Sequence, residues 1–104
     1  MLTYNDISCK KNALEKIVQD FSKDLLSIKC VPHNEHAAQI ILEIITYNDV
    51  FLPLTDTCFV NISSAGSCNI VDPYNVHLKN ADKYRHENLV RSITMNIMKC
   101  ILQD

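Results

Sequence analysis

The residues of this chain that are best suited to bind a metal ion lie in one short segment. Cys30, His33 and His36 follow one another at three-residue intervals, and thiolates and imidazoles are ligands that zinc prefers. A closed zinc site takes four such ligands, commonly as two separated pairs. The candidates for a fourth ligand form no second pair: they are Cys68, His77 and His86. We therefore expect no cofactor. The main interpretation of this segment is a turn in which His33 and His36 are exposed, and a metal site is the alternative.

A nucleophilic thiol is the second chemistry that the sequence allows. Cys68 follows a turn-like Ala-Gly-Ser segment, and His77 or His86 could act as its base, with Asp72 or Asp82 orienting that base. The chain has five cysteines at irregular intervals, a pattern that fits reduced thiols rather than a disulfide framework. A packing role for Cys68 is the main interpretation, and a small thiol or metal-dependent enzyme is the alternative.

Basic residues gather in one stretch near the C-terminal end. They are Lys79, Lys83, Arg85, His86 and Arg91, with Tyr74 and Tyr84 as aromatic neighbours. Such a stretch could contact phosphates, but acidic residues interrupt it and the whole chain has a formal net charge of -2. A nucleic-acid partner is thus the third hypothesis, behind a solvated helix face.

Composition places the chain among small globular proteins. It has 104 residues and a mass of 11.9 kDa, of which 47% are hydrophobic and 21% charged, so we expect one domain over residues 1–104. The first residues lack the pattern of a signal peptide, and the longest apolar stretch is far shorter than the roughly 20 residues of a membrane span. These features predict a cytoplasmic protein without a membrane partner. The richness in Ile, Asn and Lys is typical of AT-rich coding, as in phages, viruses and some microbes.

Two helices are expected in the first half of the chain. Apolar residues recur at helical spacing from Leu14 to Ile28, which predicts a helix over residues 8–29 that ends before Pro32. Asn34 could cap a second helix whose apolar face includes Ile41 and Ile45. The β-branched run over residues 39–46 would also suit a buried strand, since periodicity does not separate the two for so short a segment.

A β-hairpin is expected next. Residues 57–62 and 68–72 are rich in strand formers, and residues 63–67 between them are turn-forming. The register that places Ile62 opposite Cys68 also places Cys58 opposite Asp72. Residues 50–54 form an extended segment that could add a third short strand, although Pro53 excludes a central position in the ladder.

The last element is a long helix over residues 80–102, and it completes an α+β fold: two N-terminal helices, a central hairpin and this helix around one core. Met95 falls outside its apolar face. The residues expected in the core are Phe21, Leu25, Ile41, Ile45, Phe59, Val60, Ile93, Ile97 and Ile101.

The absence of a catalytic motif favours a non-enzymatic interaction protein, such as an inhibitor, immunity or accessory protein that covers a site on a larger partner. Aromatic residues and arginine carry most interface energy, so the binding residues are expected to be Tyr74, Tyr84, Arg85 and Arg91, with the hairpin loop. The apolar helix faces also make a homo-oligomer plausible.

Overall fold

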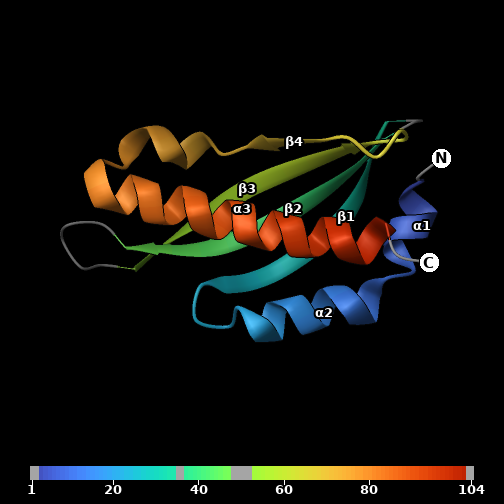
Figure 1. Cartoon of the computed structure of the whole chain (residues 1–104), viewed down its shortest axis with the longest axis horizontal. Helices are drawn as coiled ribbons and strands as arrows, with labels where there is room; N and C mark the ends of the chain where they lie inside the picture. The colour runs from blue at the N-terminus through green and yellow to red at the C-terminus, as the bar shows by residue number, and fades with distance from the viewer. Residues whose placement is uncertain (1–2, 35–36, 48–52, 103–104) are drawn as a thin grey trace.

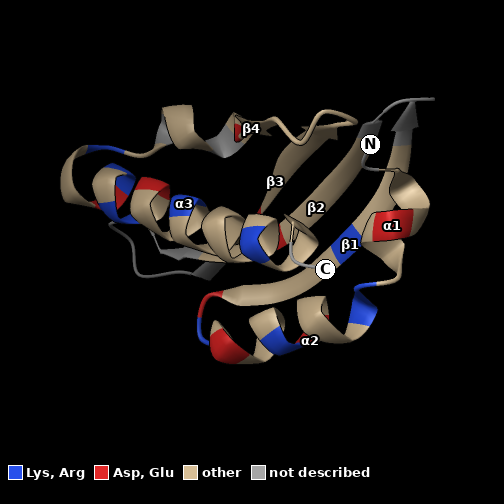
Figure 2. Ribbon diagram, turned by 45° about the vertical axis from the view of Figure 1, so that its right-hand side comes forward, with Lys and Arg blue, Asp and Glu red and all other residues tan. Residues whose placement is uncertain are grey.

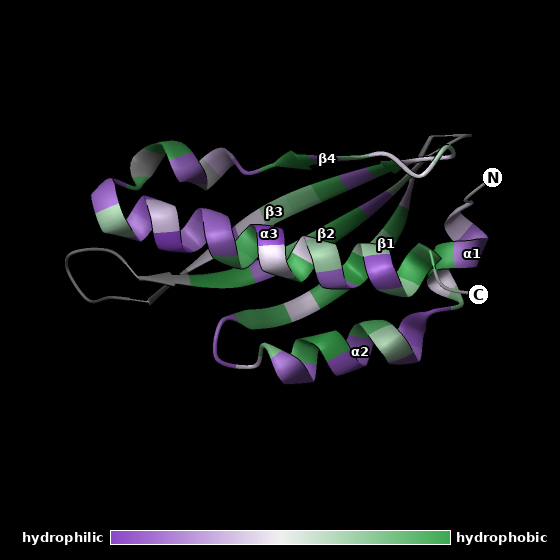
Figure 3. Ribbon diagram, viewed as in Figure 1, coloured by the Kyte–Doolittle hydropathy of each residue, from purple (hydrophilic) through white to green (hydrophobic). Residues whose placement is uncertain are grey.

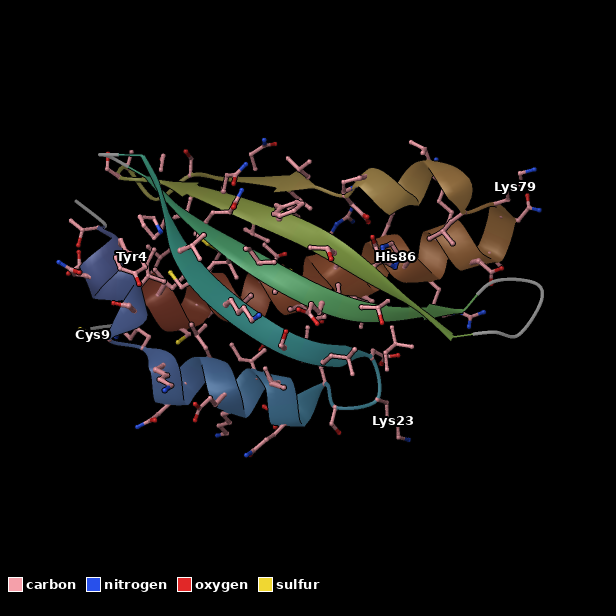
Figure 4. The ribbon with its side chains drawn as sticks, turned by 180° about the vertical axis from the view of Figure 1, so that it is seen from behind. Tyr4, Cys9, Lys23, Lys79 and His86 are labelled. Carbon is pink, nitrogen blue, oxygen red and sulfur yellow. The ribbon has the colours of Figure 1, made fainter. Side chains whose placement is uncertain are left out.

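The structure is a computed structural model that describes residues 3–34, 37–47 and 53–102, and it confirms the α+β class. A four-stranded antiparallel sheet with the order β1-β2-β3-β4 forms one layer. Figure 1 shows the helices on one side of this sheet, and Figure 4 shows the opposite side, where no described element covers it. The elements are α1 (Tyr4–Ser8), α2 (Lys11–Asp20), β1 (Leu25–Asn34), β2 (Ala37–Tyr47), β3 (Pro53–Ser63), β4 (Cys68–Val71), the 3-10 helix η1 (Pro73–His77) and α3 (Asn80–Leu102).

Alternation along the two central strands builds the core. Successive strand residues point to opposite faces of a sheet. On β2 and β3 the buried side chains are those that face the helices, such as Ile40, Leu42 and Val60. Ile41 and Phe59, which are paired across the two strands, lie half-buried on the other face. The sequence-based prediction that Ile41, Ile45 and Phe59 are buried is therefore wrong, because it ignored which face of a strand each residue occupies. Phe21, which follows α2, is also only partly buried against the core.

The long C-terminal helix is confirmed at its predicted bounds. Its buried face includes Val90, Ile93, Ile97 and Ile101, which pack in the same core as the sheet. Met95 is 55% exposed, as its place outside that face predicted. None of the described helices, α3 included, is long and apolar enough to cross a membrane.

The β3–β4 hairpin is confirmed in the predicted register. Ile62 pairs with Cys68 and Val60 pairs with Ile70. The single glycine of the chain, Gly66, has φ 88° in the connecting turn, a conformation that glycine adopts without a steric penalty. The prediction of a separate short strand at residues 50–54 is wrong for its described part, because residues 53 and 54 are the first residues of β3. Pro53 is the first residue of that strand, where a missing amide hydrogen costs little.

The predicted helix over residues 8–29 is correct only over α2 (Lys11–Asp20) and is wrong beyond it. The separate helix α1 ends at Ser8, and it is capped by Thr3 and Asp6, whose side chains each accept a hydrogen bond from the other residue's backbone N–H. Leu25 and Ile28 instead belong to β1, which pairs with β2. Pro32 is accommodated because β1 is an edge strand of the described sheet.

The predicted second helix, which was to start at Asn34, is also wrong, since residues 37–47 form β2 and pair with a strand on each side. The alternative of a strand over residues 39–46 is the correct one. Ladder hydrogen bonds on both edges and burial of alternate isoleucines override the weak helical pattern, because β-branched residues pack well on a pleated surface.

Candidate functional site

Four side chains with metal-ligating or catalytic chemistry meet beneath the sheet. Asp56 and Cys58 point inward from β3, Asp72 directly follows β4, and His86 lies on α3. One ligand atom from each of them lies within 4.8 Å of all the others. Figure 4 labels His86, whose side chain lies between α3 and the sheet. We call these four residues the buried polar cluster.

Hydrogen bonds within the buried polar cluster converge on one imidazole nitrogen. Nε2 of His86 lies 2.6 Å from Oδ2 of Asp72 and 3.3 Å from Oδ2 of Asp56. The Cys58 thiol donates to Oδ2 of Asp56 at 3.5 Å. The side chains of His86, Asp56 and Asp72 are only 4%, 6% and 10% exposed. Among the described residues, Oδ1 of Asp72 and Oδ1 of Asn75 are buried without a hydrogen-bond partner.

Burial and mutual contact shift the pKa values of the two carboxyl groups in opposite directions. Burial, together with the neighbouring Asp72, raises the pKa of Asp56 to about 6. Burial also acts to raise the pKa of Asp72, but hydrogen bonds from His86 and Asp56 outweigh it and hold that pKa below its usual value. Burial acts to lower the pKa of His86. The hydrogen bonds and the electrostatic attraction between the imidazole and the carboxyl groups of Asp72 and Asp56 outweigh burial, so the pKa of His86 is raised above its usual value. Asp72 and His86 thus form a charged pair, and Asp56 retains a proton more readily than an ordinary carboxyl group.

The buried polar cluster predicts that stability falls as the pH rises from 5 to 8. The raised pKa of Asp56 means that folding favours its neutral form, so its contribution is lost between the usual value of 3.8 and about 6. The raised pKa of His86 gives a contribution that is complete below about 6.5 and is lost as the pH passes its folded value. The lowered pKa of Asp72 gives a contribution to stability that is lost only as the pH falls below 3.8, so it does not change stability between pH 5 and 8.

Urea unfolding of the protein in EDTA at pH 5 and at pH 8 measures this effect. The Asp56→Asn variant, which keeps the side-chain volume and cannot ionise, should show a smaller decline. A wild-type stability that is flat or rises over this interval would contradict the assignment of protonation states.

A nucleophilic role does not suit the thiol of the buried polar cluster. Cys58 is fully buried, and its bond is to Asp56 rather than to the imidazole. Burial and the two adjacent carboxylates raise the pKa of Cys58 far above its usual value. A catalytic cysteine needs an accessible, stabilised thiolate, so in the absence of a cation the cluster holds an inert thiol.

A second feature is an open groove between β4, at the edge of the described sheet, and α3. Its volume is about 520 Å³. We call it the β4–α3 groove, and it is lined by Cys68, Ile70, Arg91, Thr94, Met95, Met98, Lys99 and Leu102. Ile70 and Leu102 are 38% and 60% exposed. Oγ1 of Thr94 is buried without a described hydrogen-bond partner. The groove therefore offers apolar side chains to solvent around one unsatisfied polar group.

The charges beside the groove are basic. Arg91 and Lys99 line it, and no acidic residue does. Figure 2 shows basic segments along α3, with acidic segments confined to its N-terminal half, and Figure 3 shows that the C-terminal half is the more hydrophobic. At 100° per residue, Tyr84, Arg91, Met95 and Leu102 form one stripe along α3. An apolar surface next to positive charge thus continues from the groove towards the start of the helix.

Of the predicted metal segment, the structure describes the side chain of Cys30, which is not part of the buried polar cluster. Cys30 lies half-buried in β1 and lines a hollow between α2 and β1, and burial raises the pKa of its thiol. The side chain of His33 and the whole of His36 lie outside the described residues. Metal binding at these three residues stays a prediction.

The predicted nucleophile Cys68 is exposed on the β4–α3 groove. Its proposed base and orienting group, His86 and Asp72, are in contact with each other. Asp72 is four residues further along the extended chain, which is about 13 Å from Cys68 at 3.3 Å per residue. The structure therefore joins the histidine and aspartate to Cys58 and not to Cys68.

The predicted binding residues do not form one surface in the described part of the chain, because Arg85 and Arg91 line different cavities. Tyr84 is 69% exposed, Arg91 is exposed on the groove, and Arg85 forms an ion pair with Asp82 at 3.5 Å. The side chain of Tyr74, in η1, lies outside the described part of the chain. The Arg85–Asp82 pair is solvent-exposed and therefore weak, and the nucleic-acid hypothesis stays a prediction.

Sequence reasoning found part of the buried polar cluster. The hairpin register placed Cys58 opposite Asp72, and His86 with Asp72 was one of the base and orienting-group combinations considered, although for Cys68, with His77 and Asp82 as the alternatives. Asp56 was missed, although its position two residues before Cys58 puts both side chains on one face of a strand. That spacing was a usable pattern once residues 53–63 were taken as one strand.

Fold and sites together define a two-layer α+β protein with a buried polar cluster between its layers and an apolar, basic groove at one edge. No protein-family model matches the chain, and neither a curated protein nor a solved structure does.

Proposed function

We propose that this chain is a non-enzymatic interaction protein that binds an extended, acidic and apolar segment of another protein in the β4–α3 groove. The observation that carries the proposal is the groove itself: exposed methionine, isoleucine and leucine side chains lie beside Arg91 and Lys99. Methionine-rich surfaces adapt to varied apolar side chains and recur at binding surfaces.

An extended partner fits the edge of the sheet. In the described sheet β4 is the last strand, and all four of its residues are exposed. A strand at a sheet edge presents unpaired N–H and C=O groups, which an added strand can satisfy. Cys68 and Ile70 pair with buried β3 residues and so point towards α3. Alternate side chains of an added strand would point the same way, into the groove.

An acidic partner fits the charges. Arg91 and Lys99 are eight residues apart, about 12 Å along the helix axis, and neither forms an ion pair with a residue that the structure describes. Carboxylates spaced along an extended segment could meet both. A second copy of the chain fits less well, because a twofold axis at this groove would bring the same basic residues together. Like charges across an interface act against association.

Selection of peptides from a random library by the immobilised protein tests the proposal. We expect the selected peptides to alternate apolar and acidic residues. Their affinity, measured by fluorescence anisotropy, should fall at least tenfold for Met95→Asp and for the double variant R91E/K99E. Leu26→Asp is the matched control, since Leu26 is a similarly exposed apolar residue on the opposite edge strand. Bound peptide should slow alkylation of Cys68 while leaving the exposed Cys9 unaffected.

Two results would overturn the proposal. Basic peptides, or peptides that bind all variants equally, would remove the groove as the binding surface. A dimer in light scattering that Met95→Asp converts to a monomer would assign the groove to a second copy of the chain.

A further inference from the structure

We propose that Asp56, Cys58, Asp72 and His86 bind one zinc ion between the sheet and α3. The donor types select the metal: zinc accepts thiolate, imidazole and carboxylate ligands together, whereas calcium and magnesium take oxygen ligands. The four donors come from β3, from the residue after β4 and from α3. This inference goes beyond the proposed interaction function and does not depend on it.

The spacing of the donors suits a tetrahedral ion. With metal–ligand bonds of about 2.0 to 2.3 Å, the ligand atoms of a tetrahedral zinc site lie roughly 3.3 to 3.7 Å apart. Three of the six atom pairs in the buried polar cluster measure 2.6, 3.3 and 3.5 Å, and one ligand atom of each residue lies within 4.8 Å of all the others. Side-chain movements of about 1 Å would therefore suffice to surround one ion.

One carboxylate oxygen of the buried polar cluster lacks a hydrogen-bond donor among the described residues, which is an independent indication of a cation. Oδ2 of Asp72 and Oδ2 of Asp56 both approach Nε2 of His86, which carries at most one hydrogen, so without a cation the two carboxyl groups can be satisfied together only while Asp56 keeps its proton. Oδ1 of Asp72 is buried with no described hydrogen-bond partner, on a side chain that is only 10% exposed. Buried polar atoms are nearly always satisfied in native proteins. A divalent ion would coordinate both carboxylates and the Cys58 thiolate and offset two of their three negative charges, and the protons of Asp56, Cys58 and His86 would be released to solvent on binding.

The position of the site indicates a structural role. Four protein ligands fill a tetrahedral coordination sphere, and closed sites of this kind stabilise folds rather than activate water. The ion would hold the end of β4 and the first half of α3 to the central strand β3. Cavities of about 180 and 320 Å³ reach His86 and Asp72 respectively, and they offer an ion a route from solvent.

Metal content and cobalt spectroscopy test the site. Full-length protein purified without chelators should contain one zinc per chain by elemental analysis. Protein stripped of metal and loaded with Co²⁺ should show a thiolate-to-cobalt band and the intense visible bands of tetrahedral cobalt. Cys58→Ser should abolish the thiolate band, and Cys68→Ser, which changes an exposed cysteine outside the buried polar cluster, should preserve it. Zinc at roughly a hundredfold above its dissociation constant should raise the Tm of the stripped protein by about 10 °C.

Wild-type protein that takes up no stoichiometric zinc or cobalt would overturn the inference, whatever the variants do. So would a thiolate band that survives in Cys58→Ser and is lost in Cys30→Ser, because it would place the metal at the segment of Cys30, His33 and His36. Should Cys58→Ser fail to fold, Asp72→Asn takes its place, with loss of tetrahedral cobalt bands as its readout. The groove variant R91E/K99E should retain the metal, so failure of the groove proposal leaves this test intact.

Discussion

Replacing His86 with alanine is expected to lower the free energy of unfolding by about 3 to 5 kcal/mol in the metal-free protein. The imidazole is the shared partner of Asp56 and Asp72, at 3.3 and 2.6 Å. Its removal leaves two buried carboxyl groups beside each other without a cation. The cost of an uncompensated buried charge is large because the protein interior solvates it poorly.

Urea denaturation in EDTA measures the effect, and a second variant isolates its cause. If orphaned carboxylates are responsible, adding Asp56→Asn and Asp72→Asn to His86→Ala should recover a substantial part of the loss. Lys83→Ala, an exposed position on the same helix, should change stability by less than about 0.5 kcal/mol. A His86→Ala protein as stable as Lys83→Ala would refute the ion-pair arrangement of the buried polar cluster.

The second large effect is expected from two adjacent isoleucines on β2. Ile40 is fully buried under the helices, and Ile41 is half-buried on the uncovered face opposite Phe59. Ile40→Ala should cost about 3 to 4 kcal/mol, because it removes buried methyl groups and leaves a cavity that the close-packed core cannot fill. Ile41→Ala should cost about 1 kcal/mol, because water can occupy the vacated space.

This pair is its own control, since residue type, strand and substitution are the same. The midpoints of urea unfolding give the two losses directly when the slopes agree. Equal losses would contradict a sheet that is covered on one face only.

The sequence predicted those features that depend on residues close together in the chain. The bounds of α3 follow from apolar residues at helical spacing, and the register of the β3–β4 hairpin follows from one short turn that contains Gly66. Even the nearness of Cys58 and Asp72 is a consequence of that local register. Each of these features is fixed by local geometry, whatever the rest of the chain does.

The N-terminal half could not be predicted in the same way. The apolar spacing from Leu14 to Ile28 suits a helix, and the isoleucines of residues 39–46 suit either a helix or a strand. Strand pairing decides between helix and strand for these residues. β1 and β2 are strands because β2 forms ladder hydrogen bonds with β1 on one side and with β3 on the other. Hydrogen bonds between strands and burial of one face outweigh the small differences in local propensity.

The contact between His86 and Asp56 is the feature that depends most clearly on the tertiary structure. By itself the sequence determined an α+β composition, the last helix, the hairpin and the nearness of Cys58 to Asp72. Only the packing of α3 on one face of the sheet brings the imidazole against the two carboxyl groups, leaves the opposite face free of any element that the structure describes, and opens the groove beside β4. These arrangements arise because one apolar helix face and one sheet face are buried together, and no local pattern specifies how they align.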